Sequence, residues 1–203
     1  ITSQKSKDFV LICRIKNSIN YVRGFLLMKN IFKKKLSIEE CVDSLLSLTR
    51  SIPVDLVNDK TALEAMGLAD VESLRLQLYC FQYIMYRTNL ILWSKSKDEL
   101  LYADISRQYY DRCEDYINNF TDNNRLDQGA NYYSRKKLFA EFYKLLNDNY
   151  SERLKGMICQ MSLIYYHLKD REPSCVEKSY LLSLAIEIED SIINLINSLK
   201  LNF

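Results

Sequence analysis

The segment from Leu74 to Trp93, LRLQLYCFQYIMYRTNLILW, places hydrophobic residues on nearly every side of a helix, with Arg87 among the few polar interruptions. A helix that is apolar all round normally lies in the interior of a multi-helix protein. The uncharged run Leu76–Tyr86 is too short to span a bilayer, which needs about 20 apolar residues. The pattern therefore predicts a buried central helix from about Val71 to Trp93, capped by Asp70.

Apolar residues at spacings of three and four predict further helices along the chain. They run over about 8–30, 37–50, 96–120, 132–149, 151–172 and 174–200, with a short turn at 61–67. Capping boxes, in which a Ser or Thr and a Glu three residues later bond each other's backbone, are expected at Ser37, Thr61, Ser96 and Ser174. Pro53 is expected to end the second helix near Arg50. We predict an all-α fold: an irregular bundle of about seven helices around the buried central helix.

The same spacing predicts which side chains face the interior. The inner face of 96–120 is expected to be Leu101, Ile105, Tyr109, Tyr116 or Ile117, and Phe120. The helix that follows Ser151 is expected to turn inward Leu154, Ile158, Met161 and Leu168. The last helix is expected to bury Leu181, Leu184, Ile188, Ile192, Leu195 and Leu199.

The composition is that of one helical domain. The 203 residues include only four Gly and two Pro, which leaves few positions for tight turns. The first residue is Ile rather than Met, so we expect residues 1–203 to be a single-domain fragment of a larger protein. The six Cys form no C-x-x-C pair and no zinc-ligand spacing, which favours a reducing compartment.

The charge is unevenly distributed. Residues 1–35 hold nine Lys or Arg and one acid, a net of +8, so the remainder of this +2 chain nets −6. The segment, with a basic surface at Lys33, Lys34 and Lys35, either meets nucleic acid or an acidic partner, or packs as a basic helix on its own acidic domain. We favour packing, because its Ile and Val residues also form an apolar stripe. We nevertheless predict that charge reversal at the three lysines alters partner or DNA affinity in a salt-dependent way. Unchanged affinity at low salt would mean that the segment is solvated surface.

No catalytic signature is visible. His167 is the single histidine, and neither a glycine-rich phosphate loop nor a nucleophile elbow occurs. The acidic group Glu187, Glu189 and Asp190 is interpreted as a solvated helix face. The residues therefore predict a protein that is not an enzyme and that holds no cofactor within this fragment.

Tyrosine is the unusual residue, with fifteen in the chain. On the central helix, Tyr79, Tyr83 and Tyr86 accompany Arg87 and Trp93. These five could line a pocket or a groove for a partner, or they could fill the core with their hydroxyls at its edge. We favour the core interpretation and keep the five residues as the candidate ligand- or partner-binding site.

Two phrases carry a family resemblance. A helix containing SLLSLTRSIP, ending at Pro53, is followed by the central helix, in which Leu74, Leu76, Leu78, Tyr79, Tyr86 and Arg87 recur in order. This resembles the middle homology region, the regulatory region, of fungal zinc-cluster transcription regulators. Ile158–His167 and Ser174–Lys200 resemble the later helices of that region, so the resemblance covers about three quarters of the chain. The family's Arg-Pro phrase is Arg87-Thr88 here.

The resemblance implies a nuclear, all-helical, non-catalytic domain that restrains or transmits activation by binding a protein or a small-molecule effector. It also implies that zinc and DNA are bound only through a cysteine cluster outside this fragment. The alternative is a helical docking subunit of a larger nuclear assembly, chromatin or kinetochore, with the basic segment as its interface. Neither hypothesis involves a membrane.

Overall fold

The computed structural model describes residues 36–96, 100–126 and 153–199. Six α-helices form in these ranges: α2 (Ile38–Asn58), α3 (Lys60–Ala65), α4 (Ser73–Lys95), α5 (Leu101–Asn123), α7 (Arg153–Lys169) and α8 (Cys175–Ser198). The all-α prediction is confirmed, with six helices in the described ranges where the whole chain was expected to hold about seven. The helices predicted at 8–30 and 132–149, and the basic surface at Lys33, Lys34 and Lys35, lie outside the described residues.

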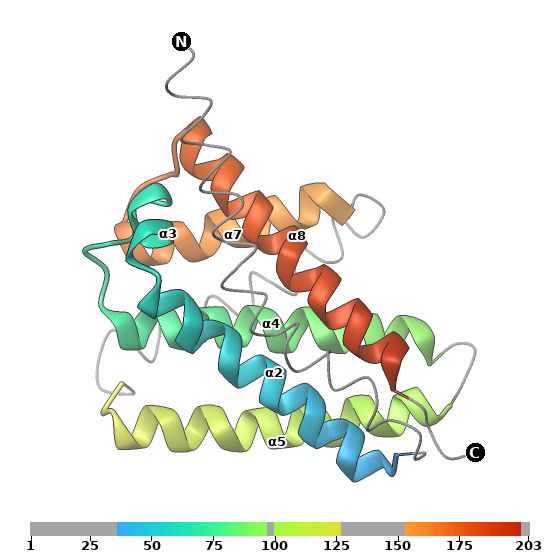
Figure 1. Cartoon of the computed structure of the whole chain (residues 1–203). Helices are drawn as coiled ribbons and strands as arrows, with labels where there is room; N and C mark the ends of the chain where they lie inside the picture. The colour runs from blue at the N-terminus through green and yellow to red at the C-terminus, as the bar shows by residue number, and fades with distance from the viewer. Residues whose placement is uncertain (1–35, 97–99, 127–152, 200–203) are drawn as a thin grey trace.

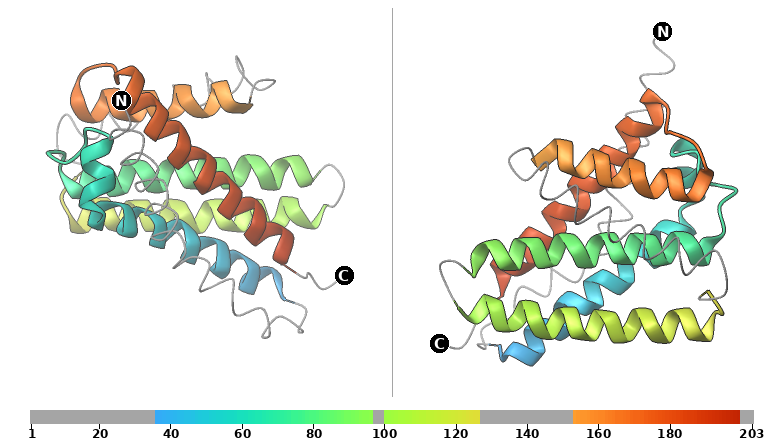
Figure 2. Two further views of the ribbon diagram at one scale, coloured as in Figure 1. Left: turned by 45° about the horizontal axis from the view of Figure 1, so that its top comes forward. Right: turned by 180° about the vertical axis from the view of Figure 1, so that it is seen from behind.

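Helix α4 occupies the middle of the molecule. It contacts α2 and α5 on one side and α7 and α8 on the other, as the views in Figures 1 and 2 show. This double coverage buries 13 of its residues, among them the polar Gln82 and Thr88. The helix begins two residues later than expected, with Glu72 rather than Asp70 at its N-cap. The Asp70 carboxylate instead lies 2.5 Å from the Lys169 ammonium at the end of α7.

The prediction that Pro53 ends the second helix is wrong, because α2 continues through it to Asn58. A proline inside a helix lacks one hydrogen bond and costs about 3 kcal/mol. Around this position the helix buries Ile52, Pro53 and Leu56. Fully burying a Leu or Ile side chain contributes about 1.5–3 kcal/mol, so packing in this stretch offsets the local penalty.

Two of the four predicted capping boxes form. At Ser37 and Ser174 the serine hydroxyl accepts from the backbone three residues on, and the glutamate there accepts from the serine N–H. The other two predictions are wrong. Helix α3 is capped by Asp59, whose carboxylate accepts from Ala62 N at 3.0 Å. Ser96 ends α4 as its C-cap.

The inward-facing predictions hold for α8, where all six residues from Leu181 to Leu199 are buried. On α5 the fully buried stripe is Ile105, Tyr109, Cys113, Ile117 and Thr121, so three of the expected positions are among those buried. On α7 the expectation for Leu154 is wrong, because 56% of its surface is exposed. That residue lies in the first turn of α7, ahead of the first buried positions of that helix.

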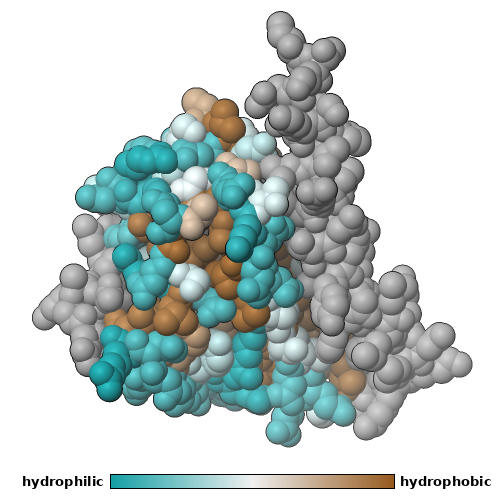
Figure 3. All heavy atoms as spheres, turned by 60° about the vertical axis from the view of Figure 1, so that its left-hand side comes forward, coloured by the Kyte–Doolittle hydropathy of each residue, from teal (hydrophilic) through white to brown (hydrophobic). Residues whose placement is uncertain are grey.

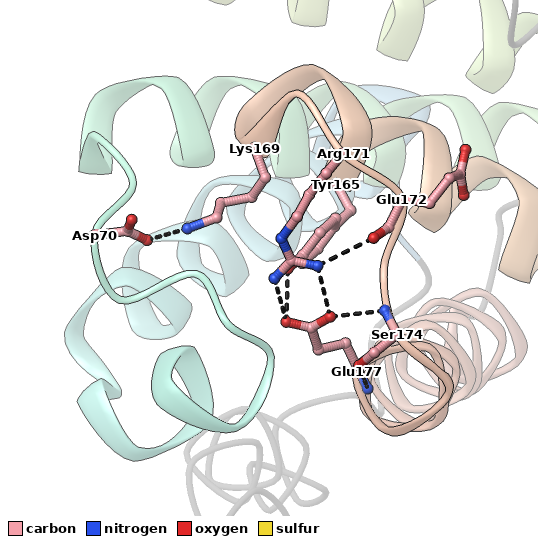
Figure 4. Close-up of polar contacts among 7 residues, drawn as sticks. All are labelled: Asp70, Tyr165, Lys169, Arg171, Glu172, Ser174 and Glu177. Atoms are coloured by element: carbon pink, nitrogen blue, oxygen red, sulfur yellow. Dashed lines mark hydrogen bonds and ion pairs between the residues drawn. The ribbon is translucent and has the colours of Figure 1, made fainter.

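A cluster of polar side chains fixes the α7–α8 corner (Figure 4). The Glu177 carboxylate accepts from the Arg171 guanidinium at 2.7 and 3.0 Å, from the Tyr165 hydroxyl at 2.7 Å and from Ser174 N at 2.7 Å. Arg171, ahead of Tyr165 and Ser174, holds the pKa of Glu177 well below its usual range. Burial, with the neighbouring carboxylate, raises the pKa of Tyr165 to about 12. The corner is therefore assembled around an ionised Glu177.

The turn between α3 and α4 packs directly onto this corner. Gly67 has φ +68°, and a Cβ built on it would lie 2.2 Å from Glu177 Oε1 and 3.0 Å from the Tyr165 hydroxyl. Only glycine meets both conditions, because a side chain is strained at that φ and has no space there. Together with the Asp70–Lys169 ion pair, Gly67 joins the start of α4 to the end of α7.

We expect Glu177→Gln to lower the free energy of unfolding at neutral pH by about 1–2 kcal/mol, because the charge-assisted hydrogen bonds are lost. A carboxylate whose pKa is depressed in the folded state stabilises the protein above its unfolded pKa of about 4.5. That contribution disappears as the pH falls further towards the folded-state pKa. The free energy of unfolding, measured with urea from neutral pH to about pH 3, should therefore fall less steeply in the variant than in the wild type.

The matched control is Glu172→Gln, because Glu172 lies on the same turn with 71% of its side chain exposed and its carboxylate 3.9 Å from the Lys178 ammonium. It should change stability by less than about 0.5 kcal/mol. If the free energy of unfolding falls equally steeply with pH in Glu177→Gln and the wild type, the role given to the ionised carboxylate is contradicted.

Candidate functional site

A groove lies between the second half of α4 and the first half of α5. The two helices are antiparallel: the rings of Phe81 and Tyr116 stack with centroids 4.5 Å apart, and Ser106 Oγ donates to Asn89 Oδ1 at 3.0 Å. The groove encloses about 410 Å³. Its lining residues, drawn from these two helices alone, are Met85, Tyr86, Asn89, Leu90, Trp93, Ala103, Ser106, Arg107, Tyr110 and Asp111.

The lining residues follow the helical repeat on both walls. On each helix they recur at positions i, i+3, i+4 and i+7, starting from Tyr86 on α4 and from Ala103 on α5. Positions with this spacing form one face of a helix. Two helix faces thus stand side by side with a groove between them, and the small Ala103 and Ser106 leave room for a close approach. This shape suits the side chains of another helix.

Trp93 stands at the edge of this groove with 62% of its surface exposed, although it is the single tryptophan of the chain. Leu100, in the turn that follows, is 84% exposed. Exposed tryptophans are uncommon away from interfaces, where they are enriched among the residues that contribute most to binding. The groove end of the α4–α5 hairpin therefore presents the kind of residue that binds a partner.

The polar groups of the groove are few and balanced in charge. Arg107 lies 3.1 Å from Asp104 in an exposed pair, and Asp111 follows one turn along the same helix. Asn89 Nδ2 is buried and finds no hydrogen-bond acceptor within the described residues. A buried donor without a partner costs about 1–3 kcal/mol, so Asn89 destabilises this wall of the groove by an amount of that order.

The structure separates the five residues of the predicted site. Tyr86 and Trp93 line the groove. Tyr79 and Tyr83 are only 2% and 1% exposed and belong to the core, Tyr79 beside the ring of His167 at 6.4 Å. Arg87 faces another helix and is 4% exposed. The five residues do not form one surface, because successive turns of a helix covered on both sides point to different neighbours.

Arg87 forms a buried ion pair with Glu189 of α8. The interpretation of Glu189 as part of a solvated face is wrong, because it is 3% exposed. A signal for its burial exists in the sequence: Ala185, Glu189, Ile192 and Ile196 share a helical stripe, and the other three members are apolar. A charged residue on such a stripe requires a buried counter-charge, and Arg87 on the central helix provides it.

A second hollow, between α2, α4 and α5 at the opposite end of the hairpin, is already filled. It encloses only about 10 Å³, less than or equal to the space that one water needs. The Arg50 guanidinium covers the Tyr116 ring there at 4.6 Å.

Figure 3 shows the left-hand side of Figure 1, where hydrophobic residues lie in the middle of the face among hydrophilic ones.

The buried cysteines are poor candidates for thiol chemistry. Burial raises the pKa of Cys80 and of Cys113 to about 12, and that of Cys41 to about 11. The thiolate is the reactive form of cysteine, so the raised pKa makes these three thiols weaker nucleophiles at neutral pH. Within the described ranges, no cluster of three His, Cys, Asp or Glu side chains is placed to hold a metal ion. The helices of the same ranges include none with the length and apolar character of a membrane span.

Sequence reasoning missed the α5 wall of the groove. This wall consists of Ala103, Ser106, Arg107, Tyr110 and Asp111, which form neither an apolar stripe nor a known motif in the sequence. No family model, no curated protein and no solved structure matches this chain. The resemblance to the regulatory region of fungal zinc-cluster regulators thus depends on the quoted residues alone and stays a prediction.

We expect Glu189→Ala to lower the free energy of unfolding by about 3–5 kcal/mol, because it leaves the Arg87 guanidinium buried without a counter-charge. The neighbouring Asp190 is exposed, so Asp190→Ala should cost less than about 0.5 kcal/mol. A double variant, Arg87→Met with Glu189→Leu, should recover most of the loss by replacing the pair with apolar side chains. Denaturant unfolding measures all three, and a Glu189→Ala cost no larger than that of the control would contradict the assignment.

Proposed function

We propose that this chain is a non-catalytic helical domain of a nuclear transcription regulator, which restrains or transmits activation by binding a protein at the α4–α5 groove. The observation that carries the proposal is Trp93, 62% exposed at the edge of an apolar groove of about 410 Å³. An exposed aromatic anchor beside an unfilled helical face is typical of protein-docking sites.

The order of the helices supports a regulator of the zinc-cluster class. The phrase SLLSLTRSIP lies on α2, and the phrase of the central helix lies on α4, with α3 between them. In the proposal, DNA and zinc are bound by a cysteine cluster in a region outside residues 1–203. If the full-length product lacks such a cluster, the proposal changes to its alternative, a docking subunit of a larger nuclear assembly.

A small-molecule effector is the second candidate for the groove. The volume falls within the usual range for ligands, about 300–1,000 Å³. Sites for such ligands normally bury about 70–90% of the ligand surface. The open side of this groove, marked by the exposure of Trp93, favours a helix over a small molecule.

The regulatory role is tested by tethering the 203-residue chain to an unrelated DNA-binding module above a reporter gene. The tethered chain should shift reporter output, and Trp93→Ala should abolish most of that shift. An aromatic anchor that becomes buried when the partner binds contributes at least about 2 kcal/mol, or roughly 30-fold in affinity. Thermal unfolding of the variant should match the wild type, since Trp93 contributes little to the core.

Val176→Ala is the matched control, because Val176 is 65% exposed on α8 and lies outside the groove. It should leave the reporter unchanged. A tethered chain that has no effect, or a Trp93→Ala variant that behaves like Val176→Ala, would contradict the proposal.

A further inference from the structure

The α4–α5 hairpin has the form of half a four-helix bundle. Its two antiparallel helices line the groove with matching i, i+3, i+4, i+7 positions, of which Trp93, Arg107 and Asp111 are exposed, and their other sides are packed on α2, α7 and α8. A face of this kind is completed when a second pair of helices packs across it. The back view in Figure 2 shows the hairpin as the outer layer of the molecule on that side.

The charges of the groove are self-complementary. Arg107 and Asp111 lie one turn apart on α5, and they are the two oppositely charged residues of the lining. When two α5 helices pack antiparallel across a two-fold axis, Arg107 of each copy lies opposite Asp111 of the other. The intrahelical Arg107–Asp104 pair is exposed on both sides, 71% and 52%, so exchanging it for an intermolecular pair costs little.

The overall charge points the same way. The lining has no net charge, so it has no electrostatic preference for nucleic acid or for a strongly charged peptide. A second copy would also cover Trp93.

We propose that the groove binds a second copy of this chain, so that two α4–α5 hairpins pair about a two-fold axis as a four-helix interface. This inference rests on the proposed function of the groove as a protein-docking site, and it names the partner. The interface is isologous, so the same residues form it on both copies. Trp93 of each copy is covered by the other, and two Arg107–Asp111 pairs form between the copies.

Sedimentation of the 203-residue chain gives the first test. At about 100 μM the mass should be twice the 24.0 kDa of one chain, and dilution should return it to the single-chain value. Trp93 is the single tryptophan, so its emission should shift to longer wavelength on the same dilution curve as it becomes solvated. A single-chain mass at this concentration, or a dimer whose Trp93 emission does not follow dilution, overturns the inference.

Charge reversal gives the sharper test. Arg107→Asp and Asp111→Arg should each raise the dimer Kd by about tenfold or more, and the double variant should restore it, because the two charges exchange places across the axis. Asp122→Arg is the matched control, an exposed acid on α5 outside the groove, and it should leave the Kd unchanged. Single variants that dimerise like the control overturn the inference.

The two proposals fail in different ways. If the chain is a monomer while Trp93→Ala still abolishes the reporter effect, the docking function stands and the partner is a different protein. If the chain dimerises through Trp93 while the reporter ignores Trp93→Ala, the pairing stands and the regulatory role falls.

Discussion

The structure depends on the burial of α4 from both sides. Because α2 and α5 cover one side and α7 and α8 the other, nearly every turn of α4 contacts a different neighbour. A helix in that position cannot segregate polar residues to one solvent-facing side, so its polar groups are buried as well. The Arg87–Glu189 pair is a direct consequence, since a buried guanidinium requires a buried carboxylate.

The two ends of α4 have different physical roles. At its start, Asp70 and Gly67 attach the chain to the α7–α8 corner, where the ionised Glu177 collects hydrogen bonds from three residues. Towards its end, the side of α4 that faces α5 lines the groove, and Trp93 is exposed. The groove thus lies on the second half of the central helix, where two packed helices can hold a partner in one geometry.

A balanced, mostly apolar groove suits regulation by docking. Its affinity would come from burying apolar surface, and its register from the charges of Arg107 and Asp111. Attaching such a site to the central helix also couples it to the core, because Tyr86 both lines the groove and is 6% exposed. A partner that shifts this part of α4 would also shift the helices packed on either side of it.

The sequence by itself determined the helical class, the buried character of residues 74–93, the capping boxes at Ser37 and Ser174 and the inner face of α8, because these follow from local hydrogen bonding and helical periodicity. It also pointed to Tyr86 and Trp93. Only the tertiary structure decided that α2 passes through Pro53, that Arg87 is the buried partner of Glu189 and that α5 forms the second wall of the groove. Each of these depends on which neighbour covers a given side of a helix, and that coverage is set by residues distant in the chain.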